Sequence, residues 1–208
     1  MSKTPLPPIE AAGPDWEGAR AYVLGRLASE LPADLHYHGL HHTQDDVLPA
    51  AERLAVRAGL DAEKTLLLNT AALYHDAGFL FRYADNEVLA SALAEQTLPQ
   101  FGYRPEQIQV IQALIEATHM PQYPVGMLQE LLCDADLDSL GREDFLETSH
   151  SLRREIEARG TFIPLQEWYS RQLEFISTHR YFSAAARALR DAGKERNIAI
   201  LQRRLEEF

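Results

Sequence analysis

Cysteine and lysine are scarce in this sequence of 208 residues, which contains one cysteine, Cys133, and three lysines. A single thiol cannot form an internal disulfide, and it excludes a zinc site made of four cysteines. Any metal ion must therefore be held by histidine and carboxylate side chains. We expect Cys133 itself to be a small buried hydrophobic residue.

Long apolar runs are also missing. Runs such as Leu66–Leu68 and Ala71–Tyr74 are far shorter than the about 20 residues that a membrane-spanning helix needs. The first residues, Met1–Pro5, lack the apolar core of a signal peptide. We therefore expect a cytoplasmic protein that does not contact a membrane.

Positive charge is in short supply as well, since the net charge is −11. This balance argues against binding to long nucleic acids, whose affinity depends on lysine and arginine contacts with phosphates. A small anionic substrate remains compatible with it. Nearly all the positive charge is on arginine, which suits bidentate phosphate contacts, although a compositional bias explains the same observation.

Apolar residues recur at steps of three and four from residue 15 onward, which predicts helices. Asp61 is a candidate N-cap, Gly59 a candidate C-terminal glycine, and Pro49 either a kink or a first-turn residue. No alternating strand pattern or internal repeat is present, so we predict a single compact all-α bundle over 15–208 behind a loose, proline-rich arm, 1–14. The predicted helices are 15–31, a second stretch ending at Gly59, 65–77, 86–98, 105–118, 126–133, 142–158, 164–178 and 183–206.

Histidine and aspartate occur where apolar residues are expected. The pair His75-Asp76 ends the most apolar predicted helix, where a buried carboxylate needs a compensating partner. A divalent cation supplies one, and a backbone group or an arginine is the alternative. His38 and His42 would share one face if their segment is helical. Three acids at alternate positions, Asp134, Asp136 and Asp138, indicate a loop, a cap or a cation site.

Taken in order, these segments resemble the HD-domain superfamily of metal-dependent phosphohydrolases, an all-α fold. The resemblance covers about 35–145 and leaves 146–208 as a helical extension without assigned chemistry. The matching segments are Tyr37–Asp45, Ala72–Phe79 and Leu132–Arg142, with Asn86-Glu87 and Ile115–His119 as further landmarks.

The resemblance implies a metal site and its ligands. By position in the pattern these are His42 rather than His41, then His75, Asp76 and Asp136, with Asp134 and Asp138 as supporting or capping acids. One divalent ion is expected, with Mn²⁺, Mg²⁺, Fe²⁺, Co²⁺, Ni²⁺ and Zn²⁺ all compatible. A second ion is less expected, because many two-metal members have a His-Glu pair where this chain has Asn86-Glu87.

The implied activity is hydrolysis of a phosphate monoester or diester by a metal-activated water, with a nucleotide as the expected substrate. His38 is the candidate general acid, and Asp76 serves both the metal and catalysis. The candidate substrate-binding residues are His119, Arg142, Glu87, Arg82 and Lys194. For Arg82 and Lys194 a solvated surface charge is the competing interpretation.

Two other functions stay open at this point. Some HD-type proteins hold two irons and activate dioxygen, and Glu116-x-x-His119 is similar to half of a di-iron motif. The other possibility is a sensor module that binds a nucleotide without turnover. The C-terminal helix, 183–206, could pack on the domain or form a homodimer.

Overall fold

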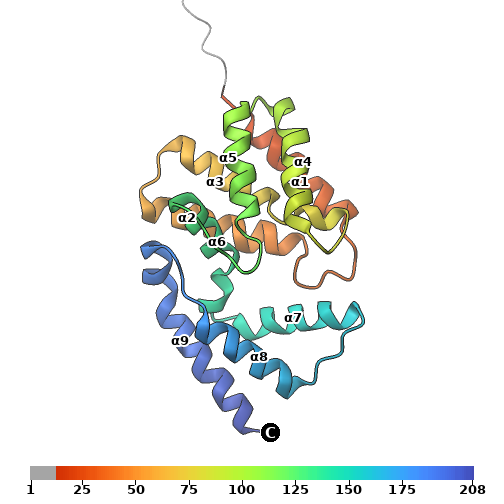
Figure 1. Ribbon diagram of the computed structural model, residues 1–208, viewed down its shortest axis with the longest axis vertical. Helices are drawn as coiled ribbons and strands as arrows, with labels where there is room; N and C mark the ends of the chain where they lie inside the picture. Colours follow the sequence, from red (N-terminus) through yellow and green to blue (C-terminus); the bar gives the residue numbers. More distant parts are fainter. Residues whose placement is uncertain (1–12) are drawn as a thin grey trace, which may run out of the picture.

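A computed structural model describes residues 13–208, and within this range every regular element is helical (Figure 1). The all-α prediction is confirmed. The predicted arm, 1–14, lies outside the described residues except for Gly13 and Pro14. The elements are α1 (Trp16–Glu30), η1 (His42–Val47), α2 (Leu48–Ala58), α3 (Ala62–Tyr74), η2 (Ala77–Leu80), α4 (Asn86–Thr97), η3 (Leu98–Phe101), α5 (Pro105–Glu116), α6 (Met127–Asp136), η4 (Asp138–Gly141), α7 (Phe145–Ala158), α8 (Leu165–Thr178) and α9 (Ala184–Glu206).

Local sequence signals explain where several helices begin and end. The Asp61 carboxylate accepts a hydrogen bond from the Lys64 amide at 2.8 Å, so the predicted N-cap of α3 is confirmed. Gly59 ends α2 in a left-handed conformation, φ 67°, which glycine adopts without steric cost. Pro49 lies in the first turn of α2 and does not kink it.

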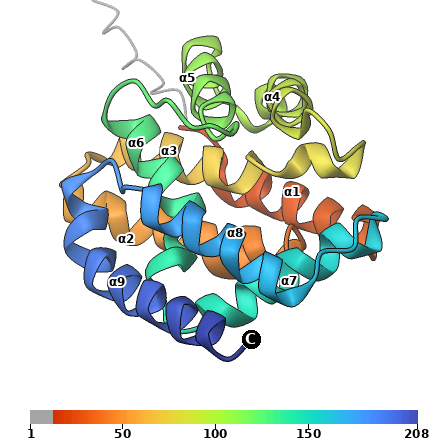
Figure 2. The same ribbon diagram turned by 60° about the horizontal axis from the view of Figure 1, so that its bottom comes forward.

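Helix α3 runs through the centre of the molecule, with α1, α2, α5 and α6 packed around it (Figures 1 and 2). Every residue from Leu67 to Tyr74 is buried, as its continuous apolar sequence predicts. The predicted C-terminal boundary at residue 77 is wrong, because α3 ends at Tyr74. His75 and Asp76 therefore lie in the turn just beyond the helix, where their side chains can diverge from its axis.

The histidine-rich connection is not a regular α-helix. Residues His36–Gly39 form bends, and His42 begins the π-helix η1, in which the Leu48 amide donates to the Thr43 carbonyl. The predicted placement of His38 and His42 on one helical face is therefore wrong. Their rings are nevertheless close, with centroids 5.8 Å apart.

Helices α7, α8 and α9 gather at one end of the molecule (Figure 1), where α9 packs against α8 and against η4. The backbones of α9 and η4 approach very closely, since a Cβ atom placed on Gly193 would lie 1.9 Å from the Gly141 carbonyl oxygen. Asn197 strengthens this contact by donating from Nδ2 to the carbonyls of Leu140 and Arg142, at 2.9 and 2.8 Å. The turn that follows α6 is thereby clamped to the C-terminal helix.

None of the helices between residues 13 and 208 combines the length and the hydropathy that crossing a bilayer would require.

Candidate metal centre

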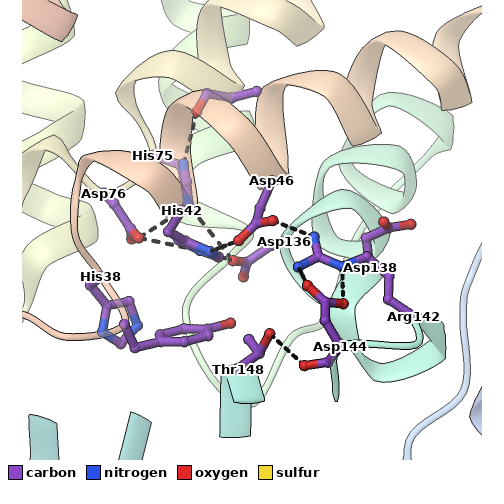
Figure 3. Close-up of polar contacts among 12 residues, drawn as sticks. His38, His42, Asp46, His75, Asp76, Asp136, Asp138, Arg142, Asp144 and Thr148 are labelled. Atoms are coloured by element: carbon purple, nitrogen blue, oxygen red, sulfur yellow. Dashed lines mark hydrogen bonds and ion pairs between the residues drawn. The ribbon is translucent and has the colours of Figure 1, made fainter. Parts of the chain in front are cut away.

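The four predicted ligands lie near the end of α3. His42 comes from the start of η1, His75 and Asp76 from the turn after α3, and Asp136 from the last residue of α6 (Figure 3). His42, His75 and Asp76 are buried and form a group whose ligand atoms could hold a metal ion. Asp136 approaches the same two imidazoles.

In this cluster each imidazole nitrogen lies close to one oxygen of each of the two carboxylates. Nε2 of His42 lies 3.5 Å from Oδ2 of Asp76 and 3.3 Å from Oδ1 of Asp136. Nε2 of His75 lies 3.2 Å from Oδ2 of Asp76 and 3.6 Å from Oδ1 of Asp136. Ligand atoms about 2.1 Å from a shared ion, at tetrahedral or octahedral angles, are about 3.0–3.4 Å from one another. The observed spacing fits a single small divalent cation.

Two buried polar atoms in the cluster lack a hydrogen bond. They are Nε2 of His75 and Oδ2 of Asp76, which lie near each other without hydrogen-bonding geometry. Buried polar atoms are normally satisfied, so each unsatisfied one requires an explanation. A cation between them would satisfy both atoms, and the residues present therefore fit a metal ion.

The electrostatics of the cluster are unusual for a protein interior. Burial works against a charge on His75, but Asp76 and Asp136 outweigh burial and raise the pKa of this imidazole well above its usual value. Burial would likewise raise the pKa of Asp76, yet His75 lowers it. Asp136 behaves in the same way, with His42 and His75 holding its pKa far below the usual range. Both carboxylates are therefore available in their ionised, ligating form.

Neighbouring groups orient the cluster side chains. The Ala72 carbonyl lies 2.8 Å from Nδ1 of His75, and because a carbonyl only accepts, Nδ1 carries a proton. Nε2 is therefore the ring nitrogen that would bind an ion, after giving up its own proton. Gln122, which was not predicted from the sequence as a site residue, donates to Oδ2 of Asp136 at 3.1 Å. Oδ2 of Asp46 lies 4.0 Å from Nδ1 of His42. Such partners hold ligands in one orientation.

Arg142, predicted to bind substrate, is engaged by two carboxylates. It hydrogen bonds to Asp46 and forms two bonds to Asp144, of 2.8 and 2.6 Å. Only 15% of its side chain is exposed. In this arrangement Arg142 neutralises Asp46, whose Oδ2 lies 4.0 Å from Nδ1 of His42.

His38, the candidate acid, lies beside the cluster and is bound to Glu155 of α7. Nδ1 of His38 is 2.5 Å from Oε1 of Glu155, and the His38 ring stacks on Phe79 with centroids 4.6 Å apart. Burial opposes protonation of His38, but the Glu155 bond reverses the effect and raises its pKa. Glu155 was missed from the sequence, although an acid beside Leu152 and Ile156 on an apolar helical face was a signal.

A cavity of about 450 Å³ opens from the cluster toward α7 and α8. Tyr37, His38 and Asp136 line its end beside the cluster, and its other polar lining residues are Ser139, Thr148, Ser149, Arg171 and Gln172. The rest of the wall is apolar, with Leu137, Leu140 and Phe145 preceding the C-terminal extension and Leu152, Ile156, Trp168 and Phe175 belonging to it. The extension thus lines the space next to the metal centre.

The other predicted substrate-binding residues pair with groups outside the four predicted ligands. His119 has a largely exposed side chain, and its Nδ1 is 3.4 Å from Oε2 of Glu87. Arg82 is exposed and pairs with Asp85 at 3.0 Å. Lys194 is buried on α9, where its Nζ donates to the His179 carbonyl at 2.6 Å. That bond ties α9 to the end of α8.

The supporting acids and the single thiol face away from the cluster. Asp134 accepts the backbone amides of Phe182 and Ser183, and Asp138 pairs with arginines of α2 and α9. Cys133 is buried as predicted, and burial raises the pKa of its thiol. No second group of three metal-ligating side chains comes together among residues 13–208.

Comparison with known proteins gives one informative match. No model of a known family and no curated protein sequence matches this chain. The structure is similar to the crystal structure of YpgQ from Bacillus subtilis in complex with ADP, with a TM-score of 0.68 over 93% of this chain and 95% of that chain. The sequences are 17% identical, so the likeness shows that the two proteins share a fold.

Proposed function

We propose that this protein is a metal-dependent phosphohydrolase of the HD-domain superfamily. The observation that carries the proposal is the buried group of His42, His75 and Asp76, in which two polar atoms lack hydrogen-bond partners. Asp136 approaches both imidazoles of this group and lines a cavity beside it. The sequence resemblance and the fold shared with YpgQ support it further.

In this proposal one divalent ion is held by His42, His75, Asp76 and Asp136. When bound, such an ion lowers the pKa of a water toward neutrality and polarises a phosphoryl oxygen. Imidazole and carboxylate ligands suit several first-row ions and Mg²⁺, so the chemistry of the ligands leaves the choice to metal availability.

His38 is the residue proposed to move a proton. Its Nδ1 is occupied by Glu155, which leaves Nε2 as the ring atom that can donate to a leaving oxygen. His38 lines the cavity, so a substrate placed there comes within its reach. His119 is the proposed contact for phosphate oxygens, because its side chain is exposed and the next residue, Met120, lines the cavity.

The proposed substrate is a phosphate ester that carries a flat or apolar group, with a nucleotide as the leading candidate. A cavity of about 450 Å³ lies within the range that small-molecule ligands occupy, roughly 300–1,000 Å³. The YpgQ structure of the same fold contains ADP, which supports a nucleotide here. Trp168 and Phe175 offer the aromatic surface on which a base can pack.

The test combines metal analysis with a substrate screen. Protein purified without added metal is analysed for bound elements and then assayed with each divalent ion against a phosphodiester, a phosphomonoester and a nucleotide panel. We expect metal-restored hydrolysis that Asp76→Ala abolishes and Asp138→Asn retains. Nucleotide binding without product would contradict the enzyme and indicate a sensor, and two irons with oxygen uptake would indicate an oxygenase.

A further inference from the structure

Glu155 is a buried acid that reaches into the candidate metal centre from outside the segment that resembles the HD family. It belongs to α7, and its side chain is fully buried. Both carboxylate oxygens are occupied. Oε2 accepts the backbone amides of Tyr37 and His38 at 2.8 and 2.9 Å, and Oε1 lies 2.5 Å from Nδ1 of His38 and accepts the Tyr83 hydroxyl at 2.9 Å.

These contacts join parts of the chain that are 117 residues apart. The loop that carries His38 has no regular secondary structure of its own, so its amides need partners from elsewhere. Glu155 supplies them. Arg159, the residue at the C-cap of α7, strengthens the same junction by lying over the Tyr83 ring at 4.0 Å and pairing with Asp34 at 3.3 Å.

The chemistry of this contact fixes the state of His38. An ionised carboxylate only accepts hydrogen bonds, so Nδ1 of His38 must carry a proton, and any exchange with a substrate must pass through Nε2. The ring is also held by its neighbours, stacked on Phe79 and edge-on to Tyr37 with both centroids 4.6 Å away. His38 thus has one orientation and one tautomer when it is neutral.

We propose that Glu155 is the positioning residue for His38, which makes α7 part of the catalytic centre. The proposal rests on the proposed phosphohydrolase function. In the reaction, His38 transfers the Nε2 proton to the leaving oxygen as the bond between that oxygen and phosphorus breaks. A carboxylate on Nδ1 stabilises the protonated imidazole that makes this transfer and keeps it aimed at the cavity.

The direct test is Glu155→Gln, with Glu157→Gln as the matched control. Glu157 is two residues further on in α7, is 29% exposed and pairs with Arg153 at 2.8 Å. The amide introduced at position 155 would place its NH₂ group against the N–H donors that Glu155 accepts in the wild-type protein. The proton of neutral His38 would then no longer be confined to Nδ1. We expect kcat for diphenyl phosphate to fall about 100-fold with Mn²⁺, while KM and bound metal stay unchanged. The control should keep full activity.

The leaving group separates a positioning role from a structural one. Departure of 4-nitrophenolate needs little protonation, so bis(4-nitrophenyl) phosphate should lose less than about tenfold in Glu155→Gln. In a His38→Ala background the same substitution should cost nothing further. An equal loss for both esters, or a further loss in the His38→Ala background, would overturn the proposal.

Nitrogen NMR of the imidazoles gives a readout that does not depend on activity. The His38 signals, assigned by their loss in His38→Ala, should show protonated Nδ1 in the wild-type protein at every pH at which it is folded. Protonation at Nε2 alone would overturn the proposal, whatever the variants do. If no phosphate ester is hydrolysed, the proposed function fails while this measurement still decides the role of Glu155. If Glu155→Gln does not fold, Tyr83→Phe removes one bond to the same carboxylate and should shift these signals.

Discussion

The two sides of the segment from Asp134 to Asp138 use the same residue type in different ways. Asp136 faces the imidazoles of His42 and His75, and Gln122 donates to it from its side-chain amide. On the opposite side, Asp138 receives two bonds of 2.7 Å from Arg190 and one of 3.1 Å from Arg53. Asp134 receives two backbone amides at 2.8 and 2.7 Å.

The difference shows how to tell a ligating acid from a structural one. A carboxylate surrounded by N–H donors has its charge compensated and needs nothing more. Other carboxylates lie close to a ligating acid, and few N–H donors neutralise its negative charge. A bound cation would neutralise that charge. The number and kind of partners therefore separate the two roles. Asp134 and Asp138 are buried, whereas the Asp136 side chain is 17% exposed.

The largest expected effect is on activity, in Asp136→Asn compared with Asp138→Asn. Loss of a ligand should remove bound metal and about 4 kcal/mol of transition-state stabilisation, which is about 1,000-fold in kcat/KM. Asp138→Asn should retain its metal and stay within about threefold of wild type per folded molecule. Steady-state kinetics and elemental analysis of the same samples measure both. Equal activities in the two variants would show that the comparison is mistaken.

The next effect is on stability, in Asp138→Ala. Removing this acid leaves Arg190 and Arg53 without their partner in a largely buried site, and we expect the free energy of unfolding to fall by about 3 kcal/mol. Both arginines reach solvent, which keeps the loss at the low end for broken buried pairs. Urea unfolding measures it. Arg53→Ala is the control and should cost about 1 kcal/mol, because that side chain is 43% exposed.

A smaller effect is expected for Asp134→Asn. The amide oxygen can still accept one of the two backbone N–H groups, so the free energy of unfolding should fall by about 1 kcal/mol. Burial also raises the pKa of Asp134, which means that its charge is costly and its replacement by a neutral group partly offsets the lost bond. A loss as large as in Asp138→Ala, measured by the same unfolding assay, would show that the charge itself is required.

The smallest expected effect is a change with pH in the free energy of unfolding, and it involves Glu155. Like Asp134 and Asp138, Glu155 accepts hydrogen bonds at both carboxylate oxygens. Its hydrogen bonds lower its pKa from 4.5 to about 2 against the effect of burial, so its stabilising contribution is present above pH 4.5 and is lost as the pH falls toward 2. His38 has a pKa raised above 6.5, so its contribution is present below pH 6.5 and is lost as the pH rises through the folded value.

The stability difference between wild type and Glu155→Gln should therefore be largest between about pH 4.5 and 6.5. Urea unfolding of both proteins across this range measures it. A difference that keeps growing above pH 6.5 would contradict the assigned pairing of Glu155 with a protonated His38.

Local patterns were sufficient for most of the fold. The three- and four-residue recurrence of apolar residues places the helices, and capping residues such as Asp61 set their starts within a few residues. The end of α3 lies three residues before the predicted boundary at 77. Just beyond it, Gly78 lies so close to the Asn86 carbonyl that a Cβ atom would be 1.8 Å from its oxygen, a contact that the apolar pattern of the helix does not indicate.

The sequence predicts those parts of the site whose residues lie close together along the chain, and it does not predict those that depend on contacts between distant segments. The predicted ligands occur in short recognisable segments. The structure brings His42, His75 and Asp76 together in one group, and Asp136 lies 3.3 Å from His42 and 3.6 Å from His75. Contacts between distant segments produce no comparable motif in the sequence. No spacing rule connects Glu155 to His38.

Arg142 shows the same limit at a single side chain. Asp144 is two residues away and visible as a partner, whereas Asp46 is 96 residues away. Only the folded chain brings the second carboxylate to this guanidinium, so the sequence does not show that two acids engage Arg142.

The π-helix at His42–Val47 makes the metal centre depend on the length of the chain as well as on its composition. Each residue of a regular α-helix turns the chain by about 100°, since a turn contains about 3.6 residues. Deleting any one residue between Thr43 and Val47 would therefore rotate His42 away from His75 while leaving every ligand in the sequence. A relative with all four ligands but a shorter segment here would retain the signature of the site and lose its geometry.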